Sequence, residues 1–366
     1  MNDDGRKDDG RKGERVEERN RNSQLLNSSL VPVTPLRAGE RSSLVLRFSG
    51  KTTNSELRTE NSGLRMMATD YKKEAVGLIK GRTLFDAPMR QFTSIKVGGP
   101  ADGLFFPKDV KELRKLVRRA GRKNIPLLVL GKGTNLVVKD TGIRGWVISL
   151  TQGMRKIQMK EEVVEAEAGL PLQRLVQFSI ERGLTGLEPF FGIPGTVGGG
   201  LAMNAGAWGA ELKDLVLSVT LMKEDGEVVD RTRERLKFSY RNLSLPASWI
   251  ILGGRFQLEK GDKGEILERV KTYSEVRKRT QPLDYPSAGS IFKNPEEGPA
   301  GKWIEEAGLK GFKMGQAMVS DLHANFIINL GKATAEEVIN LMEWVEKKIY
   351  DEKGISLERE IEVVGE

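Results

Sequence analysis

A glycine-rich stretch in the middle of the chain limits the possible folds more than any other feature. Seven glycines fall between Gly192 and Gly209, and most of their neighbours are apolar (GIPGTVGGGLAMNAGAWG). A flexible linker would carry polar residues instead. Glycines among apolar residues allow a backbone to pass close to another group. The stretch therefore predicts either a loop whose backbone N–H groups bind a ligand or a tight buried loop that binds nothing.

A second glycine segment, LGKGTNL at residues 130–136, follows the apolar run at 125–130. Such a turn can present backbone N–H groups to an anion, and Thr134 and Asn135 can add side-chain hydrogen bonds. Leu136 stands where a dinucleotide fingerprint needs its third glycine, and no Gly-Lys-Ser/Thr of a P-loop follows. An anion-binding loop and an ordinary hairpin turn both remain open.

Cysteine and histidine content excludes several kinds of chemistry. The chain has no cysteine and one histidine, His323. Disulfides, thiolate nucleophiles and cysteine-bound metals are therefore excluded, and Ser-His-Asp triads and multi-histidine metal sites are strongly disfavoured. We expect no metal site, so a redox reaction would need an organic cofactor.

The formal net charge of +8 is compatible with a polyanionic ligand, such as a dinucleotide or a UDP-sugar, and with nucleic acid. Basic residues alternate with acidic ones along the chain, which is typical of an ordinary solvated surface. No apolar run approaches the roughly 20 residues that cross a bilayer, and the polar N-terminus lacks the apolar centre of a signal peptide. We expect a cytoplasmic protein without a membrane or nucleic-acid partner.

The 366 residues exceed what one hydrophobic core usually holds, so several domains are expected. Residues 1–66 are expected to form a disordered extension, because they are polar and begin with a charged repeat, DDGRK. Met66 or Met67 is an alternative first residue.

The remainder predicts a mixed α+β fold. Helices are expected at 109–122, opened by a capping box of Asp109 and Glu112, from Pro171 onward, at 266–277, and from Thr334, with Glu337 in the box position, to Gly354. Strands are expected at 125–130, 163–168, 215–223, 249–256, 323–330 and 356–364.

Further motifs follow in a fixed order. They are TSIKVGGPA at 93–101, LGKGTNLVV at 130–138, GLEPFFGIPGTVGGGLAMNAGAWGAE at 186–211, Tyr240-Arg241, QPLDYPSAGSIFKNP at 281–295, AGLKG at 307–311, HANFIIN at 323–329 and the segment 357–365. With these motifs, from about residue 92 to 365, the chain resembles the UDP-N-acetylenolpyruvoylglucosamine reductases (UDP-N-acetylmuramate dehydrogenases) among the vanillyl-alcohol-oxidase-like flavoproteins.

The resemblance implies a two-subdomain FAD-binding fold of the PCMH type at 67–262, divided into 67–150 and 151–262, and a C-terminal α/β substrate-binding domain at 263–366. It implies noncovalent FAD, NADPH as the hydride donor and a UDP-sugar substrate. UDP-N-acetylglucosamine enolpyruvate would be reduced to UDP-N-acetylmuramate for peptidoglycan. The chain would be a monomer or a weak oligomer. The short stretch between Arg241 and Gln281 resembles the shorter class of the family, which lacks a loop and a tyrosine that close over the substrate.

The resemblance also implies site residues. FAD would be bound by Leu130, Gly131, Lys132, Gly133, Thr134, Asn135, Leu136, Gly192, Ile193, Pro194, Gly195, Thr196, Val197, Gly198, Gly199, Asn204 and Gly206. The substrate would be bound by Tyr240, Gln281, Lys293 and Asn294.

Three catalytic roles are implied in the same way. Arg241 would stabilise growing negative charge, Ser290 would donate a proton and Glu360 would polarise the intermediate. An arginine can form paired hydrogen bonds with a carboxylate at any working pH. A serine is a weak acid that needs nearby charge to donate. Alternation alone puts Glu358, Glu360 and Glu362 on one strand face, and the family motif selects Glu360.

Two other functions compete. One is a related FAD oxidoreductase that acts on a sugar or a hydroxy acid. The other is a nucleic-acid or surface-binding protein, although only 6% of residues are aromatic and no recognition motif is present. The family often has a serine two residues after the arginine of Tyr-Arg, whereas this chain has Leu243 there and Ser244 next.

Overall fold

The computed structural model describes residues 45–46 and 71–366. Apart from Val45 and Leu46, which form a short strand, the extension expected at 1–66 lies outside the described residues. Among the helices of the described part, none is long and apolar enough to cross a membrane.

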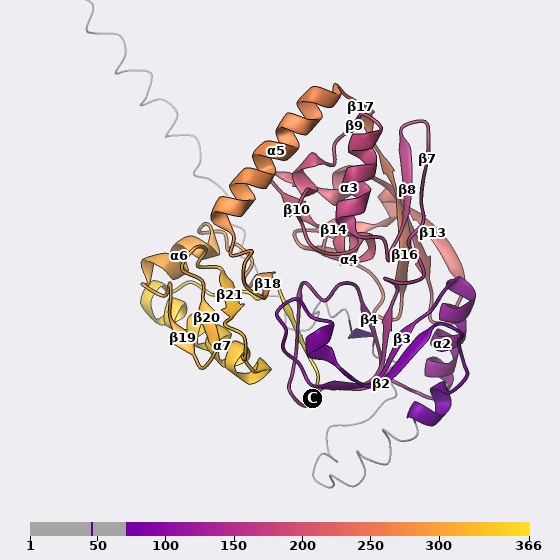
Figure 1. The fold of residues 1–366 in the computed structure, drawn as a ribbon, viewed down its shortest axis with the longest axis horizontal. Helices are drawn as coiled ribbons and strands as arrows, with labels where there is room; N and C mark the ends of the chain where they lie inside the picture. Colours follow the sequence, from indigo (N-terminus) through magenta and orange to yellow (C-terminus); the bar gives the residue numbers. More distant parts are fainter. Residues whose placement is uncertain (1–44, 47–70) are drawn as a thin grey trace, which may run out of the picture. The chain divides into compact units, whose positions relative to one another are not determined.

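The first sheet has parallel central strands and antiparallel outer ones, in the order β1-β4-β6-β3-β2. Its strands are β1 (Val45–Leu46), β2 (Arg82–Pro88), β3 (Pro100–Phe106), β4 (Leu127–Leu130) and β6 (Ile143–Ser149). The 3-10 turn η1 (Met89–Gln91) follows β2. Helix α2 (Val110–Arg122) lies beside this sheet (Figure 1), and its residues Leu113, Leu116 and Val117 share an apolar cluster with Trp146.

The start of α2 differs from the expected capping box. The Asp109 side chain accepts the N–H of Glu112, as predicted. The Glu112 carboxylate instead accepts backbone N–H groups of Lys80, Gly81 and Lys108. Glu112 therefore ties the chain before β2 to the helix, and only half of the box forms.

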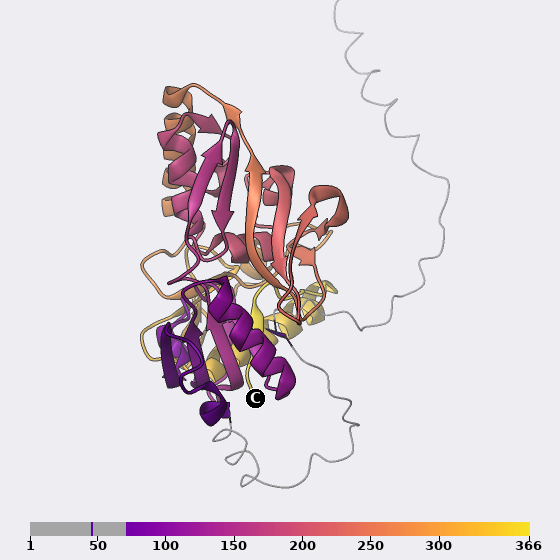
Figure 2. The same ribbon diagram turned by 90° about the vertical axis from the view of Figure 1, so that its right-hand side faces the viewer.

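The second sheet is antiparallel throughout, in the order β13-β12-β16-β8-β7, and Figure 2 shows its strands side by side. Its strands are β7 (Ile157–Lys160), β8 (Val163–Glu167), β12 (Val216–Met222), β13 (Val228–Thr232) and β16 (Ile250–Gln257). Helices α3 (Leu172–Glu181) and α4 (Val197–Ala202) share its apolar cluster, which includes Phe190 and Phe256.

Short elements connect these layers. They are β9 (Leu184–Thr185) paired with β17 (Glu259–Lys260), the hairpins β10 (Gly206–Ala207)–β11 (Ala210–Glu211) and β14 (Lys237–Ser239)–β15 (Asn242–Ser244), and the turns η2 (Glu188–Phe190), η3 (Leu212–Asp214) and η4 (Arg233–Arg235).

The C-terminal part contains an antiparallel sheet in the order β18-β21-β20-β19 with two helices. The elements are β18 (Ser287–Ser290), α6 (Ala300–Glu306), β19 (Lys313–Met314), β20 (Ala317–Val319), β21 (Phe326–Asn329) and α7 (Ala335–Lys353). The capping box of Thr334 and Glu337 is complete, and α7 ends at Gly354 with a φ of 69°, both as predicted. Ile95, Val97 and Val137 join the core of this part.

The last residues depart from the expected strand at 356–364. Only β22 (Glu362–Val364) is a strand, and it forms a separate two-stranded parallel sheet with β5 (Leu136–Val138). Val364, near the C-terminus (marked C in Figure 1), shares an apolar cluster with residues of the first sheet. Glu360 precedes β22, so it does not share a strand face with Glu358. The strand expected at 323–330 likewise begins only at Phe326, after His323.

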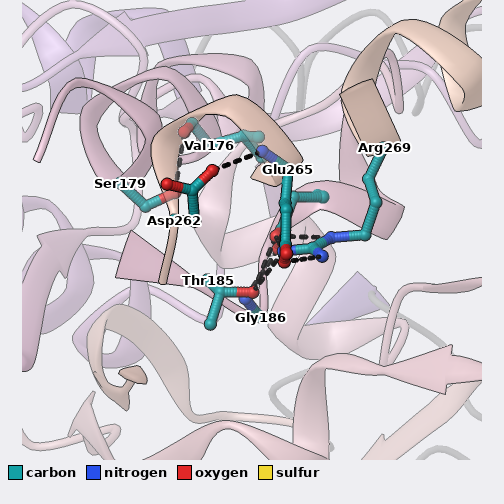
Figure 3. Close-up of polar contacts among 8 residues, drawn as sticks. Val176, Ser179, Thr185, Gly186, Asp262, Glu265 and Arg269 are labelled. Atoms are coloured by element: carbon teal, nitrogen blue, oxygen red, sulfur yellow. Dashed lines mark hydrogen bonds and ion pairs between the residues drawn. The ribbon is translucent and has the colours of Figure 1, made fainter. Parts of the chain in front are cut away.

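Helix α5 (Lys263–Thr280) is fixed near its start by polar contacts (Figure 3). Asp262 accepts the N–H of Glu265 at 3.0 Å. The Arg269 guanidinium lies 2.9 Å from Glu188 and 3.1 Å from the Thr185 hydroxyl. Helix α5 therefore packs on β9 and η2. The domain boundaries at 150 and 262 stay predictions.

Candidate functional site

The first glycine loop, residues 131–135, connects β4 with β5. Gly133 has a φ of +63°, and a Cβ there would lie 2.2 Å from the carbonyl oxygen of Phe92, so no larger residue fits. No hydrogen bond joins the backbone N–H groups of Lys132, Gly133 or Thr134 to another described residue. The loop therefore offers free donors of the kind that bind a phosphate.

The second glycine loop, residues 192–196, contacts the first. The Thr134 hydroxyl donates to the carbonyl of Pro194 at 3.2 Å, and a Cβ on Gly131 would lie 2.9 Å from the hydroxyl oxygen of Thr196. Thr196 caps α4 by accepting the N–H of Gly199 at 3.2 Å. The two loops form one cradle, and the glycines and free N–H groups fit the pyrophosphate of a dinucleotide such as FAD.

Strand β18 brings Ser290 to this cradle. The Ser94 hydroxyl contacts the carbonyls of both Gly133 and Ser287, at 3.2 and 2.6 Å. Gly289 has a φ of +83°, and a Cβ there would lie 3.8 Å from the carbonyl oxygen of Thr134. The Ser290 hydroxyl is half-buried and makes no hydrogen bond with any described residue. It is therefore available to a substrate.

Arg241 and Glu360 form an ion pair although they are 119 positions apart in the chain, with 3.1 Å between Nε and the carboxylate. The Arg241 Nη1 donates to the Gly206 carbonyl at 2.9 Å. The Nε–H itself is buried but not aligned for a hydrogen bond. Arg241 also has a φ of 56°, which is unfavourable for a non-glycine residue. Strain of this kind is characteristic of functional positions.

Backbone contacts join Glu360 to Ser290. The Glu360 N–H donates at 2.7 Å to the carbonyl of Ile291, the residue after Ser290. The Asn135 side chain donates to the Glu360 carbonyl at 3.1 Å. Burial raises the pKa of Glu360, and the charges of Arg241 and Lys293 offset part of that rise. The structure thus pairs Arg241 with Glu360 and joins the Glu360 backbone to the residue after Ser290.

The four residues predicted to bind substrate differ in their surroundings. Tyr240 is exposed, and the Arg241 guanidinium lies 5.2 Å from the centre of its ring. Lys293 pairs with Glu358 at 2.5 Å. Asn294 accepts the N–H of Ala300 at the start of α6, and Gln281 accepts a hydrogen bond from Arg277.

Several residues predicted to bind FAD have their side chains in the protein interior. Leu130, Leu136 and Val197 belong to apolar clusters, and Ile193 packs against one. Asn204 is fully buried. Its side chain donates to the Ser239 carbonyl at 3.0 Å and accepts the N–H of Lys213. Only the backbone of these residues could face a ligand, whereas Lys132 is exposed and Gly195 and Gly198 are half-buried.

Sequence reasoning missed Asn325, which lies within the quoted HANFIIN motif. Its side chain donates to the Phe292 carbonyl at 2.8 Å and accepts the Phe292 N–H at 2.9 Å. The Ile291 N–H donates to the Asn325 carbonyl at 2.9 Å. Asn325 therefore holds the strand end that follows Ser290.

The fold and the cradle together define an FAD-binding flavoprotein. A family model described as "FAD binding domain" matches residues 101–232, and one described as "UDP-N-acetylenolpyruvoylglucosamine reductase, C-terminal domain" matches 281–364. The chain belongs to the UDP-N-acetylenolpyruvoylglucosamine reductase family.

Individual relatives support this assignment. The reductase of Syntrophus aciditrophicus (strain SB) is 44% identical over 300 residues, which cover 81% of this chain and 96% of that one. The reductase of Caldanaerobacter subterraneus subsp. tengcongensis is 42% identical, with 79% and 96% covered. The crystal structure of the reductase from Thermus caldophilus superposes with a TM-score of 0.68 at 36% identity and covers 78% of this chain and 100% of that one.

Proposed function

We propose that Arg241, Ser290 and Glu360 form the catalytic group of this chain, and that the two glycine loops hold the FAD. The chain is an FAD- and NADPH-dependent oxidoreductase, and its reaction is the reduction of UDP-N-acetylglucosamine enolpyruvate to UDP-N-acetylmuramate in peptidoglycan synthesis. The observation that carries the catalytic assignment is the Arg241–Glu360 pair, whose glutamate is hydrogen-bonded to the residue after Ser290.

The two glycine loops would hold FAD, and the bound flavin would supply hydride transfer from NADPH to the terminal carbon of the enolpyruvyl group. The double bond is consumed, and negative charge then spreads over the adjacent carbon and the carboxylate. Arg241 stabilises this charge, because its guanidinium is held in the site by Glu360 and by the Gly206 carbonyl. Burial raises the pKa of Glu360 and the charges of Arg241 and Lys293 lower it. Glu360, held beside Arg241, helps to polarise the intermediate.

Ser290 supplies the remaining proton. Its Oγ–H bond breaks as a C–H bond forms at the carbon next to the carboxylate, and the serine recovers its proton from solvent. The positive charges of Arg241 and Lys293 lower the cost of the transient serine anion. Tyr240, whose ring lies beside the Arg241 guanidinium, and Lys293 are proposed to bind the substrate together with Gln281 and Asn294. A cytoplasmic location and a monomeric or weakly associated state belong to the same proposal.

An absorption experiment tests the function. The purified protein should show the yellow absorption band of oxidised flavin, which should bleach with NADPH in the absence of oxygen and return when the enolpyruvyl UDP-sugar is added. A flavin that is bleached by NADPH but is not reoxidised by the enolpyruvyl sugar would indicate an oxidoreductase for another substrate. A protein that takes up no FAD would contradict the assignment of the cradle.

Ser290→Ala tests the proton donor. The variant should keep its flavin and its reduction by NADPH but lose about 10²–10⁴-fold in reoxidation by the sugar, the usual contribution of a general acid. Ser287→Ala, at the other end of β18, is the matched control and should leave reoxidation unchanged. A wild-type reoxidation rate in Ser290→Ala would disprove the role.

A further inference from the structure

One side of α5 faces the glycine-rich stretch through three residues spaced four apart, Arg269, Tyr273 and Arg277. Arg269 binds Glu188, which lies just before the second glycine loop. The Tyr273 ring stacks on Trp208 with 5.2 Å between centroids. Arg277 reaches Gly192, where a Cβ would lie 3.0 Å from the Arg277 Cδ. Positions four apart lie on one side of a helix, so the three contacts form a continuous seam.

The two arginines of this seam differ in their partners. Arg269 has the Glu188 carboxylate at 2.9 Å. Arg277 forms no ion pair with any carboxylate of the described residues; its Nη1 donates to the neutral amide of Gln281 at 3.1 Å, and its Nε–H is buried without a partner. Burial lowers the pKa of the Arg277 guanidinium, and no nearby charge counteracts it. Arg277 is half-buried, and a cation withdrawn from water without a counter-ion is costly, so the position favours an anion.

The surroundings of Arg277 indicate which anion fits. Gly192 has a φ of +79°, and its backbone lies so close to Arg277 that a side chain at position 192 would collide with the arginine. Three residues further on, Gly195 lies against Thr134 of the first loop, with 3.6 Å between an added Cβ and the Thr134 hydroxyl. Arg277 therefore stands at one end of the cradle, where a fork of N–H donors matches phosphate oxygens.

We infer that Arg277 binds a phosphate of a nucleotide diphosphate held against residues 192–196. The inference rests on the proposed function, in which both FAD and the UDP-sugar carry a pyrophosphate. Helix α5 then contributes to nucleotide binding, with Arg269 as its anchor and Arg277 as its ligand contact.

The experiment compares Arg277→Gln and Arg277→Lys with Arg279→Gln, which removes one exposed charge from the same helix. Full-length flavin-depleted protein is titrated with FAD and with riboflavin, which lacks phosphates, by flavin fluorescence. Flavin-loaded protein is titrated with UDP and with uridine by calorimetry. Thermal melting of each variant checks folding.

Loss of a charged hydrogen bond to phosphate should weaken one diphosphate ligand by about 10- to 100-fold in Arg277→Gln, with a smaller loss in Arg277→Lys and none in Arg279→Gln. A loss for FAD but not for riboflavin identifies the cofactor phosphate, and a loss for UDP but not for uridine identifies that of the substrate. Unchanged affinities, or equal losses with and without phosphate, overturn the inference. If the reduced wild-type flavin is not reoxidised by the enolpyruvyl sugar but Arg277→Gln still binds FAD more weakly than the wild type, the proposed reaction is wrong and the phosphate contact of Arg277 is supported.

Discussion

Replacing Asn325 by alanine should damage both the stability of the C-terminal part and the geometry of the catalytic group. The side chain is 4% exposed and makes two hydrogen bonds to the backbone of Phe292. Its removal leaves a buried N–H and a buried C=O unpaired. Each such group costs about 1–3 kcal/mol, so the free energy of unfolding should fall by about 2–6 kcal/mol.

The catalytic effect has a separate cause. Phe292 follows Ile291, whose carbonyl accepts the N–H of Glu360. A loosened strand end therefore shifts Ser290 relative to Glu360. A displacement of about 1 Å can cost on the order of 100-fold in rate. Reoxidation by the enolpyruvyl sugar should slow by roughly this factor, whereas flavin reduction by NADPH should stay near the wild-type rate, because the glycine loops are untouched.

Asn329→Ala is the matched control. Asn329 is also buried, and it bonds the Ile95 carbonyl and the N–H groups of Gly331 and Ala333, away from Ser290. Urea denaturation should show a comparable loss of stability in both variants, and stopped-flow absorption should show slow reoxidation in Asn325→Ala alone. Equal reoxidation rates in the two variants would refute the positioning role of Asn325.

Two further predictions concern the loops and the buried acid. Gly133→Ala should release flavin and lower the free energy of unfolding by more than about 2 kcal/mol, because a left-handed φ alone costs about 1–2 kcal/mol and the added Cβ also collides with the Phe92 carbonyl. The control Gly209→Ala, at a φ of +81° with nothing within 4 Å of the added Cβ, should keep its flavin. Equal flavin-to-protein absorbance ratios in the two purified variants would contradict this reasoning. Burial raises the pKa of Glu360, so folding favours the protonated carboxyl more than the unfolded chain does. The stability of the wild type should therefore fall relative to that of Glu360→Gln as the pH rises from about 4.3, the ordinary pKa of a glutamate, through the raised pKa. Urea midpoints measured across this pH range would contradict the prediction if the wild type gained stability relative to the variant.

Local patterns predicted the regular elements well. Apolar spacing indicated α2, α3, α5 and α7, and the residues that end α7 were identified because capping depends on neighbours within one turn. The strand expected at 356–364 was too long, because alternation of apolar residues also arises where a segment merely packs on a core. Leu357 and Ile361 are buried without belonging to β22.

The sequence by itself determined the chemistry that is possible: without cysteine and with one histidine, redox work requires a bound cofactor. The two glycine segments predict where a backbone could approach that cofactor. Only the tertiary structure decided which residues meet. The pairing of Arg241 with Glu360, the clamp of Asn325 on Phe292 and the approach of Arg277 to Gly192 join residues at least 33 positions apart. Such contacts depend on how sheets and helices pack, and no local spacing encodes them.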